Sequence, residues 1–269
     1  MRYEIVDGLQ IPKIGFGTWR IGGGSSPDRS QDPRYLTALR SALDLGYTHF
    51  DTAEMYGGGH AEELLGRAIR ESGVPRDRVF ITSKVTPDHL RYEQVLKACD
   101  ASLRRLGSDY LDLYLIHWPS IAIKLPETFR ALNHLVKMGK VRRLGVSNFD
   151  LRLLKAAEEL SETPLLTNQV PYSLADRSYA SNGVLAYCRS RGILLTAYEP
   201  VLKGRLKPGK ALQAVAQARG ISPYQIALAW LVTQPRVIAI PMSQDATHQR
   251  ENLAAGDMEL SEQEMAALG

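Results

Sequence analysis

The stretch HFDTAEMYGGGH, residues 49–60, places an aspartate, a tyrosine and three glycines between two histidines, directly after an apolar segment. Three kinds of chemistry fit these residue types. The glycines suggest a phosphate-binding loop, the histidines suggest a metal site, and the spacing of Asp51 and Tyr56 suggests a proton donor with a partner. Which of these is correct depends on the residues that the fold brings next to them.

Polar residues recur along the first half of the chain at a constant interval. Each of the following four lies 33 residues after the one before it, at the end of a short apolar segment: Thr18, Asp51, Lys84 and His117. One strand with its following helix and connections has about this length. The spacing therefore predicts that these side chains lie at the ends of four consecutive strands.

Eight apolar segments alternate with helix-like segments, the first of which begins at Asp32-Pro33 and a later one at Ser222-Pro223. Strands are predicted at 14–19, 48–53, 79–84, 110–118, 141–148, 165–170, 193–200 and 237–243. This alternation is typical of a (β/α)8 TIM barrel, in which the carboxyl ends of the strands form the active-site face. A doubly wound sheet is the alternative, although GFGTWR lacks the third glycine of a dinucleotide-binding motif.

Residues 1–12 are predicted to form a β-hairpin, because alternating apolar residues flank Asp7-Gly8, a dipeptide that favours tight turns. A barrel of this kind commonly accounts for a chain of 269 residues, so we predict one domain over 1–269.

The 33 basic and 29 acidic residues are spread along the whole chain and give a net charge of +4 without a basic cluster. This distribution argues against a nucleic-acid partner and favours a small-molecule ligand. No apolar stretch approaches the ~18 residues that a membrane span needs, and the N-terminus lacks a signal-peptide core. The sequence therefore predicts a cytoplasmic protein without membrane contact, as a monomer or weak oligomer.

Lys84 ends the segment VFITSK on the same side as Phe80 and Thr82, which would place its ammonium inside the barrel. A buried cation needs a partner, and Asp51 at the end of the neighbouring strand is the natural one. A structural ion pair is one interpretation. Tyr56 favours another, since a nearby ammonium would lower the phenol pKa and make a tuned general acid. His117 could then donate a hydrogen bond to a substrate oxygen.

A metal-dependent barrel hydrolase is a rival interpretation, because His49 and Asp51 share a strand and Lys84 and His117 end the next two strands. No further histidine ends a later strand, and Tyr56 would have no role. We therefore predict no metal site.

The chain resembles the aldo-keto reductase family, of the bacterial or archaeal type with short loops. The resemblance is carried by GYTHFDTAEMYG, ITSK, LYLIHWP, GKVRRLGVSNF and TNQVPYS, and it runs from about Ile11 to Asn252. It implies that Asp51, Tyr56, Lys84 and His117 form a catalytic tetrad. It also implies that aldehydes or ketones are reduced by hydride transfer from C4 of NADPH or NADH, with Tyr56 as the general acid. A barrel that binds the nucleotide without catalysis is the alternative.

The same resemblance implies a cofactor site. Ser147, Asn148 and Gln169 match the positions that bind the carboxamide, and three hydrogen-bonding side chains suit a neutral amide. Tyr198 matches the residue that stacks on the nicotinamide. The full predicted set is Thr18, Trp19, Asp51, Ser147, Asn148, Gln169, Tyr198, Glu199, Pro200, Val201, Leu202, Gly204, Met242, Ser243, His248, Glu251 and Asn252.

Two positions depart from the family pattern for an adenosine 2′-phosphate, which has a lysine and an arginine where this chain has Met242 and His248. A phosphate needs a cationic partner, so these residues predict appreciable use of NADH, alone or alongside NADPH. Glu199 also replaces a usual serine, with no assigned role. The loop after His117 and the C-terminus are short, which predicts an open substrate pocket, broad in specificity, lined by Trp19, Tyr56, His117 and Trp118.

Overall fold

The structure is a computed structural model that describes residues 1–269, and its centre is a sheet of eight parallel strands. Neighbouring strands pair in chain order: β3 (Phe16–Gly17), β4 (His49–Asp51), β5 (Phe80–Val85), β6 (Leu111–Ile116), β7 (Val141–Ser147), β8 (Leu165–Pro171), β9 (Leu194–Tyr198) and β10 (Val237–Ala239). A parallel bridge between Ile14 and Ala239 joins the two ends of the sheet. The predicted (β/α)8 barrel is confirmed, and the strand order excludes a doubly wound sheet.

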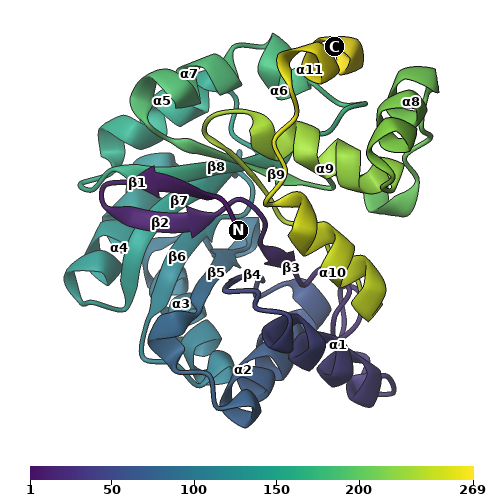
Figure 1. The fold of residues 1–269 in the computed structure, drawn as a ribbon. Helices are drawn as coiled ribbons and strands as arrows, with labels where there is room; N and C mark the ends of the chain where they lie inside the picture. The colour runs from purple at the N-terminus through teal and green to yellow at the C-terminus, as the bar shows by residue number, and fades with distance from the viewer.

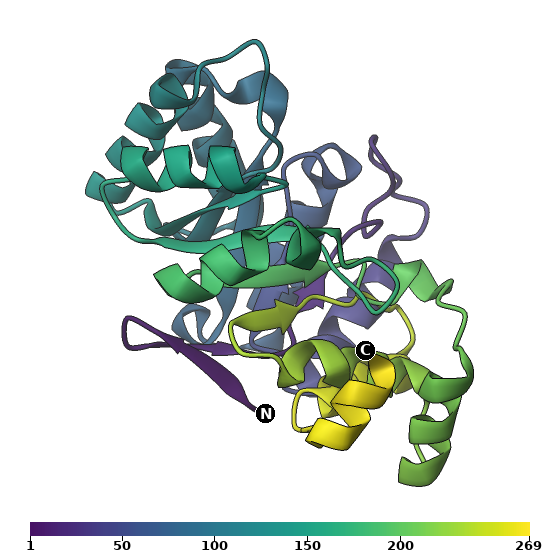
Figure 2. The same cartoon turned by 90° about the horizontal axis from the view of Figure 1, so that it is seen from above.

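Helices cover the outside of the strands (Figures 1 and 2). They are α1 (Asp32–Asp44), α2 (His60–Ser72), α3 (Tyr92–Leu106), α4 (Leu125–Lys137), α5 (Leu151–Leu160), α6 (Ser178–Ser181), α7 (Val184–Arg191), α8 (Lys210–Arg219), α9 (Pro223–Thr233), α10 (Ala246–Ala255) and α11 (Glu262–Leu268). Ser222 caps α9 through a capping box with Gln225, as the Ser-Pro pair predicted. None of these helices combines the length and the apolar character needed to cross a membrane.

The N-terminal hairpin consists of β1 (Tyr3–Val6) and β2 (Leu9–Pro12), and Asp7 and Gly8 turn between them with φ angles of 48° and 78°. Both central residues have positive φ, as a tight hairpin turn of this type requires. The hairpin crosses one end of the barrel in Figure 1 and projects at an edge of the molecule in Figure 2. Its apolar side chains pack on the barrel interior, in a cluster of Val6, Ile11, Leu113, Leu115, Leu166, Leu194 and Ile238. The predicted hairpin is confirmed, and it closes the end opposite the strands' carboxyl ends.

Candidate active site

The carboxyl ends of the first four barrel strands bring together the polar residues that recur every 33 positions. Asp51 ends β4, Lys84 is the penultimate residue of β5, and His117 directly follows β6. All three side chains are buried, and Lys84 is fully excluded from solvent. Thr18 follows β3, and its hydroxyl donates to the backbone oxygen of Asp51 at 3.0 Å. The fold therefore places one ionisable or polar side chain from each strand at the same barrel end.

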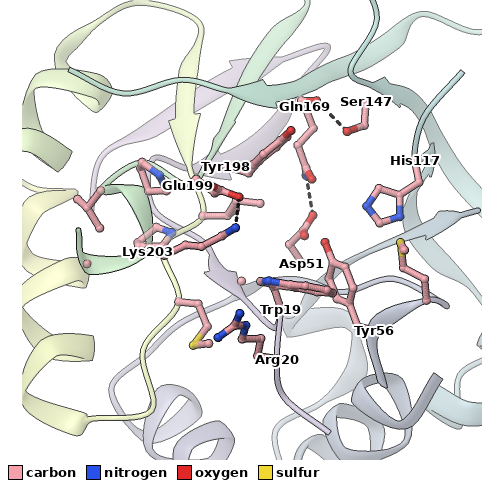
Figure 3. Close-up of a pocket in the computed structure, with 18 of the residues that line it drawn as sticks. Trp19, Arg20, Asp51, Tyr56, His117, Ser147, Gln169, Tyr198, Glu199 and Lys203 are labelled. Carbon is pink, nitrogen blue, oxygen red and sulfur yellow. Dashed lines mark hydrogen bonds and ion pairs between the residues drawn. The ribbon is translucent and has the colours of Figure 1, made fainter. Parts of the chain in front are cut away.

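Lys84 is the centre of this group. Its ammonium donates to Asp51 Oδ1 at 2.5 Å, to the backbone oxygen of Thr52 at 2.8 Å and to the Tyr56 hydroxyl at 3.3 Å. These three acceptors use all three protons of the ammonium. Because the Tyr56 oxygen accepts from Lys84, its own proton is left to donate toward the cavity (Figure 3).

The three glycines after Tyr56 form the turn that leads into α2. Gly57, Gly58 and Gly59 have φ angles of 57°, 59° and 95°, a region that other residues rarely adopt. A Cβ on Gly57 would lie 2.4 Å from the Gly22 oxygen. The N–H groups of Gly57 and Gly58 donate to backbone oxygens of Gly24 and Met55. The glycines therefore shape a connection and do not form a phosphate cradle.

The two histidines that flank this stretch have other partners. His49 lies 3.1 Å from the Thr82 hydroxyl through Nε2. His60 begins α2, and its two ring nitrogens lie 2.7 Å from carboxylate oxygens of Asp32 and Glu63. No group of three or more His, Cys, Asp and Glu side chains is arranged to bind a metal ion.

Burial raises the pKa of Tyr56 well above that of a free phenol, and the charge of Asp51 raises it further. The predicted lowering of this pKa by Lys84 is therefore wrong for the structure. The reason is that burial disfavours the charged phenolate, and Asp51, 2.5 Å from Lys84, offsets the attraction of the ammonium. The phenol stays protonated at neutral pH, which is the form that a general acid requires.

His117 is a neutral imidazole in this environment. Burial, with a smaller contribution from the Lys84 charge, lowers its pKa to about 2. Its Nδ1 is buried without a hydrogen-bond partner. The ring lies edge-on to Tyr56, with the ring centres 5.6 Å apart, and stacks on Trp118 at 4.0 Å. A neutral imidazole beside the phenol can donate or accept one hydrogen bond.

A cavity of about 480 Å³ opens above these side chains. Its lining includes all four predicted substrate-pocket residues, Trp19, Tyr56, His117 and Trp118, and ten predicted cofactor residues: Trp19, Asp51, Ser147, Gln169, Tyr198, Glu199, Pro200, Val201, Gly204 and Met242. Lys84 lies beneath the surface of the cavity and acts on it only through Asp51 and Tyr56. A cavity of this size, lined by aromatic and polar side chains together, suits a small organic ligand.

The three residues predicted to bind a carboxamide differ in how they are placed. Ser147 and Gln169 line the cavity, whereas Asn148 does not. Both N–H groups of the Asn148 amide are used, on the His117 backbone oxygen and on Ser147 Oγ, each at 3.0 Å. Its oxygen accepts from the Tyr198 hydroxyl at 2.8 Å. Asn148 therefore supports its neighbours in this structure and has no free N–H group for a ligand.

Seven further predicted cofactor residues do not line the main cavity. Thr18 and Asn148 follow β3 and β7, Leu202 belongs to the loop after β9, His248, Glu251 and Asn252 lie on α10, and Ser243 is the seventh. Ser243 lines a neighbouring cavity of about 430 Å³, which shares Met242 with the first and also contains Arg34 and Asp245.

The loop after β9 covers one side of the cavity. Within this loop, Glu199 and Lys203 form an ion pair at 2.7 Å (Figure 3). Glu199, Leu202 and Lys203 have φ angles of 51°, 53° and 58°, so three residues with side chains adopt a conformation that favours glycine. The ion pair gives Glu199 a local partner, a contact that the sequence alone left unassigned.

Six lining residues fall outside the predicted set: Gly17, Arg20, Met55, Lys203, Ile240 and Pro241. Arg20 and Met55 are direct neighbours of Trp19 and Tyr56, so adjacency to predicted residues is the signal that could have found them. Gly17 has a steric reason for its type, because a Cβ there would lie 2.8 Å from the Ile240 oxygen.

Comparisons with known proteins agree with this geometry. Residues 13–269 match the Aldo/keto reductase family. Methylglyoxal reductase YeaE of Escherichia coli (strain K12) is 40% identical, over 97% of this chain and 90% of its own length. Glyoxal reductase of Bacillus subtilis (strain 168) is 36% identical, over 97% and 89% of the two chains.

Solved structures show the same similarity. The thermostable aldo-keto reductase Tm1743 has a TM-score of 0.95 and 44% identity, covering 100% of this chain and 98% of its own. An aldo/keto reductase from Klebsiella pneumoniae, solved with NADP and acetate, has a TM-score of 0.88 and 40% identity, covering 100% and 94%. The chain therefore belongs to the aldo/keto reductase family, as the resemblance predicted. It is an oxidoreductase that acts on carbonyl groups.

Proposed function

We propose that this protein reduces aldehydes and ketones to alcohols with NADPH or NADH, and that Tyr56 is the general acid. The observation that carries the proposal is the contact of the protonated Tyr56 phenol with the Lys84 ammonium, at the floor of a cavity that also contains neutral His117. A carbonyl oxygen placed between Tyr56 and His117 would receive two hydrogen bonds where negative charge develops.

The residues of the chain account for the proton in this reaction. As the carbonyl carbon gains a hydride, Tyr56 gives its proton to the carbonyl oxygen, and the product is an alcohol. The phenolate left behind accepts a hydrogen bond from Lys84, which Asp51 keeps in place. This contact stabilises the charge where it forms and costs little reorganisation.

The cavity fits a nicotinamide cofactor, which when bound supplies the hydride. Gln169 Oε1 accepts no hydrogen bond from the protein, and Gln169 lines the cavity, so it can accept from the primary amide of the nicotinamide. Tyr198 presents its ring to the same cavity, where it can pack against a flat ring. We assign the remaining cofactor contacts to Thr18, to the loop that follows Tyr198, and to Met242, Ser243, His248, Glu251 and Asn252.

Small dicarbonyl compounds are the substrates we propose first. Two relatives are named as methylglyoxal and glyoxal reductases. The wall near Tyr56 is made of Trp19, Met55 and Trp118, and Trp118 is 38% exposed. An aromatic, open wall favours small and varied carbonyl compounds over one tightly bound substrate, which supports broad specificity.

The cofactor preference follows from the residues near Met242. The relative from Klebsiella pneumoniae was solved with NADP. In this chain Met242 and exposed His248 offer no permanent charge to a 2′-phosphate, and in the neighbouring cavity the charge of Arg34 is accompanied by the opposite charge of Asp245. We therefore propose that NADH is used appreciably. A large advantage of NADPH over NADH in kcat/KM would contradict this.

The decisive experiment follows the absorbance of NADH and NADPH with methylglyoxal, glyoxal and a panel of aldehydes and ketones. We expect turnover by the wild type and a fall in kcat/KM of roughly 10²–10⁴-fold for Tyr56→Phe, the usual contribution of a general acid. Tyr114→Phe is the matched control, because the Tyr114 hydroxyl is buried without a partner outside the cavity. Equal rates for wild type and Tyr56→Phe would overturn the role of Tyr56. Binding of the dinucleotide without any turnover would favour a non-catalytic barrel.

We also propose that residues 1–269 form one domain, since a single sheet contains all eight barrel strands and the family match covers 13–269. A cytoplasmic location, and a monomeric or weakly oligomeric state, stay predictions from the sequence.

A further inference from the structure

The carboxylate of Asp51 links two parts of the site. Its Oδ1 accepts from Lys84 at 2.5 Å, and its Oδ2 accepts from Gln169 Nε2 at 2.7 Å. Asp51 is 1% exposed and Gln169 is 3% exposed, so no solvent replaces either contact. Figure 3 shows the Gln169 side chain reaching from β8 to Asp51 across the barrel end. One carboxylate therefore contacts both the proton-donor group and the proposed carboxamide subsite.

This contact fixes which way the Gln169 amide faces. An ionised carboxylate accepts hydrogen bonds and donates none, so the NH2 end of the amide must face Asp51. Turning the amide over would place its oxygen against a carboxylate oxygen in a buried site, where an unpaired polar contact is costly. Gln169 Oε1 consequently faces away from Asp51 and acts as an acceptor at the cavity lining.

The donor groups of the neighbouring polar side chains already have partners within the protein. The Ser147 hydroxyl donates to the Gln169 backbone oxygen at 2.8 Å. Both N–H groups of Asn148 and its oxygen have partners within the protein. At this part of the cavity, the orientation of Gln169 Oε1 is thus fixed by Asp51, and no protein group donates to it. A ligand with an N–H or O–H group can fill this position.

We propose that Asp51, by orienting Gln169, makes the site select a cofactor that carries a carboxamide against its deamido analogue, in which a carboxylate replaces the carboxamide. This inference rests on the proposed function. The NH2 group of a carboxamide can donate to Gln169 Oε1. A carboxylate has no proton to donate, and it would bring a negative charge next to that oxygen and close to Asp51. Asp51 is therefore a positioning residue for cofactor selection as well as the partner of Lys84.

Binding measurements test this without turnover. The quenching of Trp19 and Trp118 fluorescence can report the Kd of NADP and NAD and of their deamido analogues, nicotinic acid adenine dinucleotide and its phosphate. For the wild type we expect the carboxamide forms to bind at least about 30-fold tighter, because a site built for a donor rejects an analogue without one. For Asp51→Asn the ratio should fall to about 3-fold or less, because an asparagine can donate as well as accept and the Gln169 amide can turn.

Two further variants keep the result interpretable. Asp51→Asn leaves the buried Lys84 charge unpaired, so the double variant Asp51→Asn/Lys84→Met removes both charges and should show the same loss of selectivity in a folded protein. Glu62→Gln is the matched control, since Glu62 is a fully buried carboxylate paired with Arg105 outside the cavity. It should keep the wild-type ratio.

The outcomes separate the inference from the proposed function. Tight binding of the carboxamide and deamido forms alike by the wild type, or an unchanged ratio in both Asp51 variants, would overturn the inference and leave the reductase function standing. Failure of the wild type to bind either form would overturn both.

Discussion

Two buried lysine–carboxylate pairs lie at opposite ends of the barrel. Lys84 pairs with Asp51 at the carboxyl ends of the strands, and Lys13 pairs with Glu4 at the end that the hairpin covers, both at 2.5 Å. Burial lowers the pKa of both lysines. Both pairs combine a buried lysine with the same distance, and the carboxylates differ in burial, since the Glu4 side chain is 13% exposed and the Asp51 side chain is 2% exposed.

The two pairs differ in the other groups that accept hydrogen bonds from each lysine. Lys13 donates its other protons to the backbone oxygens of Gln234 and Val237. Lys84 donates to one backbone oxygen and to a phenol that borders a cavity. A pair whose remaining partners are all backbone groups contributes to structure alone. A pair that contacts a titratable group in a cavity can stabilise a change in charge there.

Replacing each lysine by methionine gives the largest predicted difference. For Lys84→Met we expect kcat/KM to fall roughly 10²–10⁴-fold, because Tyr56 loses the group that stabilises its phenolate. For Lys13→Met we expect unchanged kcat/KM per folded molecule and a loss of about 3 kcal/mol in the free energy of unfolding, since Glu4 loses a buried partner. Denaturant unfolding and steady-state kinetics on both variants measure this. A similar loss of activity in both would remove the distinction.

The pH dependence of reduction sharpens the same contrast. Burial lowers the pKa of Lys84 below its usual value. Raising the pH through this lowered pKa removes the Lys84 proton, so kcat/KM should fall on the alkaline side. His117, with a pKa of about 2, stays neutral between about pH 5 and 8 and should produce no acidic limb there. The profile of kcat/KM at saturating cofactor tests both statements. An acidic limb near the usual histidine pKa that disappears in His117→Gln would contradict the second.

The barrel and its polar strand ends could be predicted because they depend on local pattern. The 33-residue interval, the Asp7-Gly8 turn and the Ser222 cap each leave a signal within a short stretch. The state of Tyr56 could not be predicted in this way. Its pKa depends on how completely the fold buries it and on how far Asp51 cancels Lys84, which are both tertiary properties. Asn148 is committed to His117 and Tyr198, which come from other strands, so its sequence neighbours carry no sign of it.

A smaller effect is expected for Met242, the residue we assign to the cofactor preference. Met242 lines both the main cavity and the neighbouring one that contains Arg34 and Asp245. Met242→Lys adds a permanent charge, so we expect the ratio of kcat/KM for NADPH over NADH to rise about 10-fold, as one charge-assisted hydrogen bond to a phosphate would produce. Met242→Gln, polar and uncharged, is the control and should change the ratio little. Equal shifts in both variants would show that polarity, and not charge, sets the preference.

The smallest effect is expected for a third ion pair, Glu199–Lys203, which differs from the two buried pairs in its exposure. Its side chains are 35% and 41% exposed, so solvent screens the attraction and the pair contributes less than about 1 kcal/mol. It joins two residues of positive φ in the loop above the cavity, and breaking it in Lys203→Gln should loosen that loop. We expect cofactor dissociation, measured by stopped-flow fluorescence, to accelerate at most about 5-fold in low salt. Added salt should accelerate dissociation from the wild type, because it screens the attraction between Glu199 and Lys203. The variant lacks this ion pair, so salt should not accelerate its dissociation in the same way. Lys207→Gln, an exposed neighbour in the same loop, should retain the wild-type salt response, and a loss of that response there would assign it to the charge of the loop as a whole.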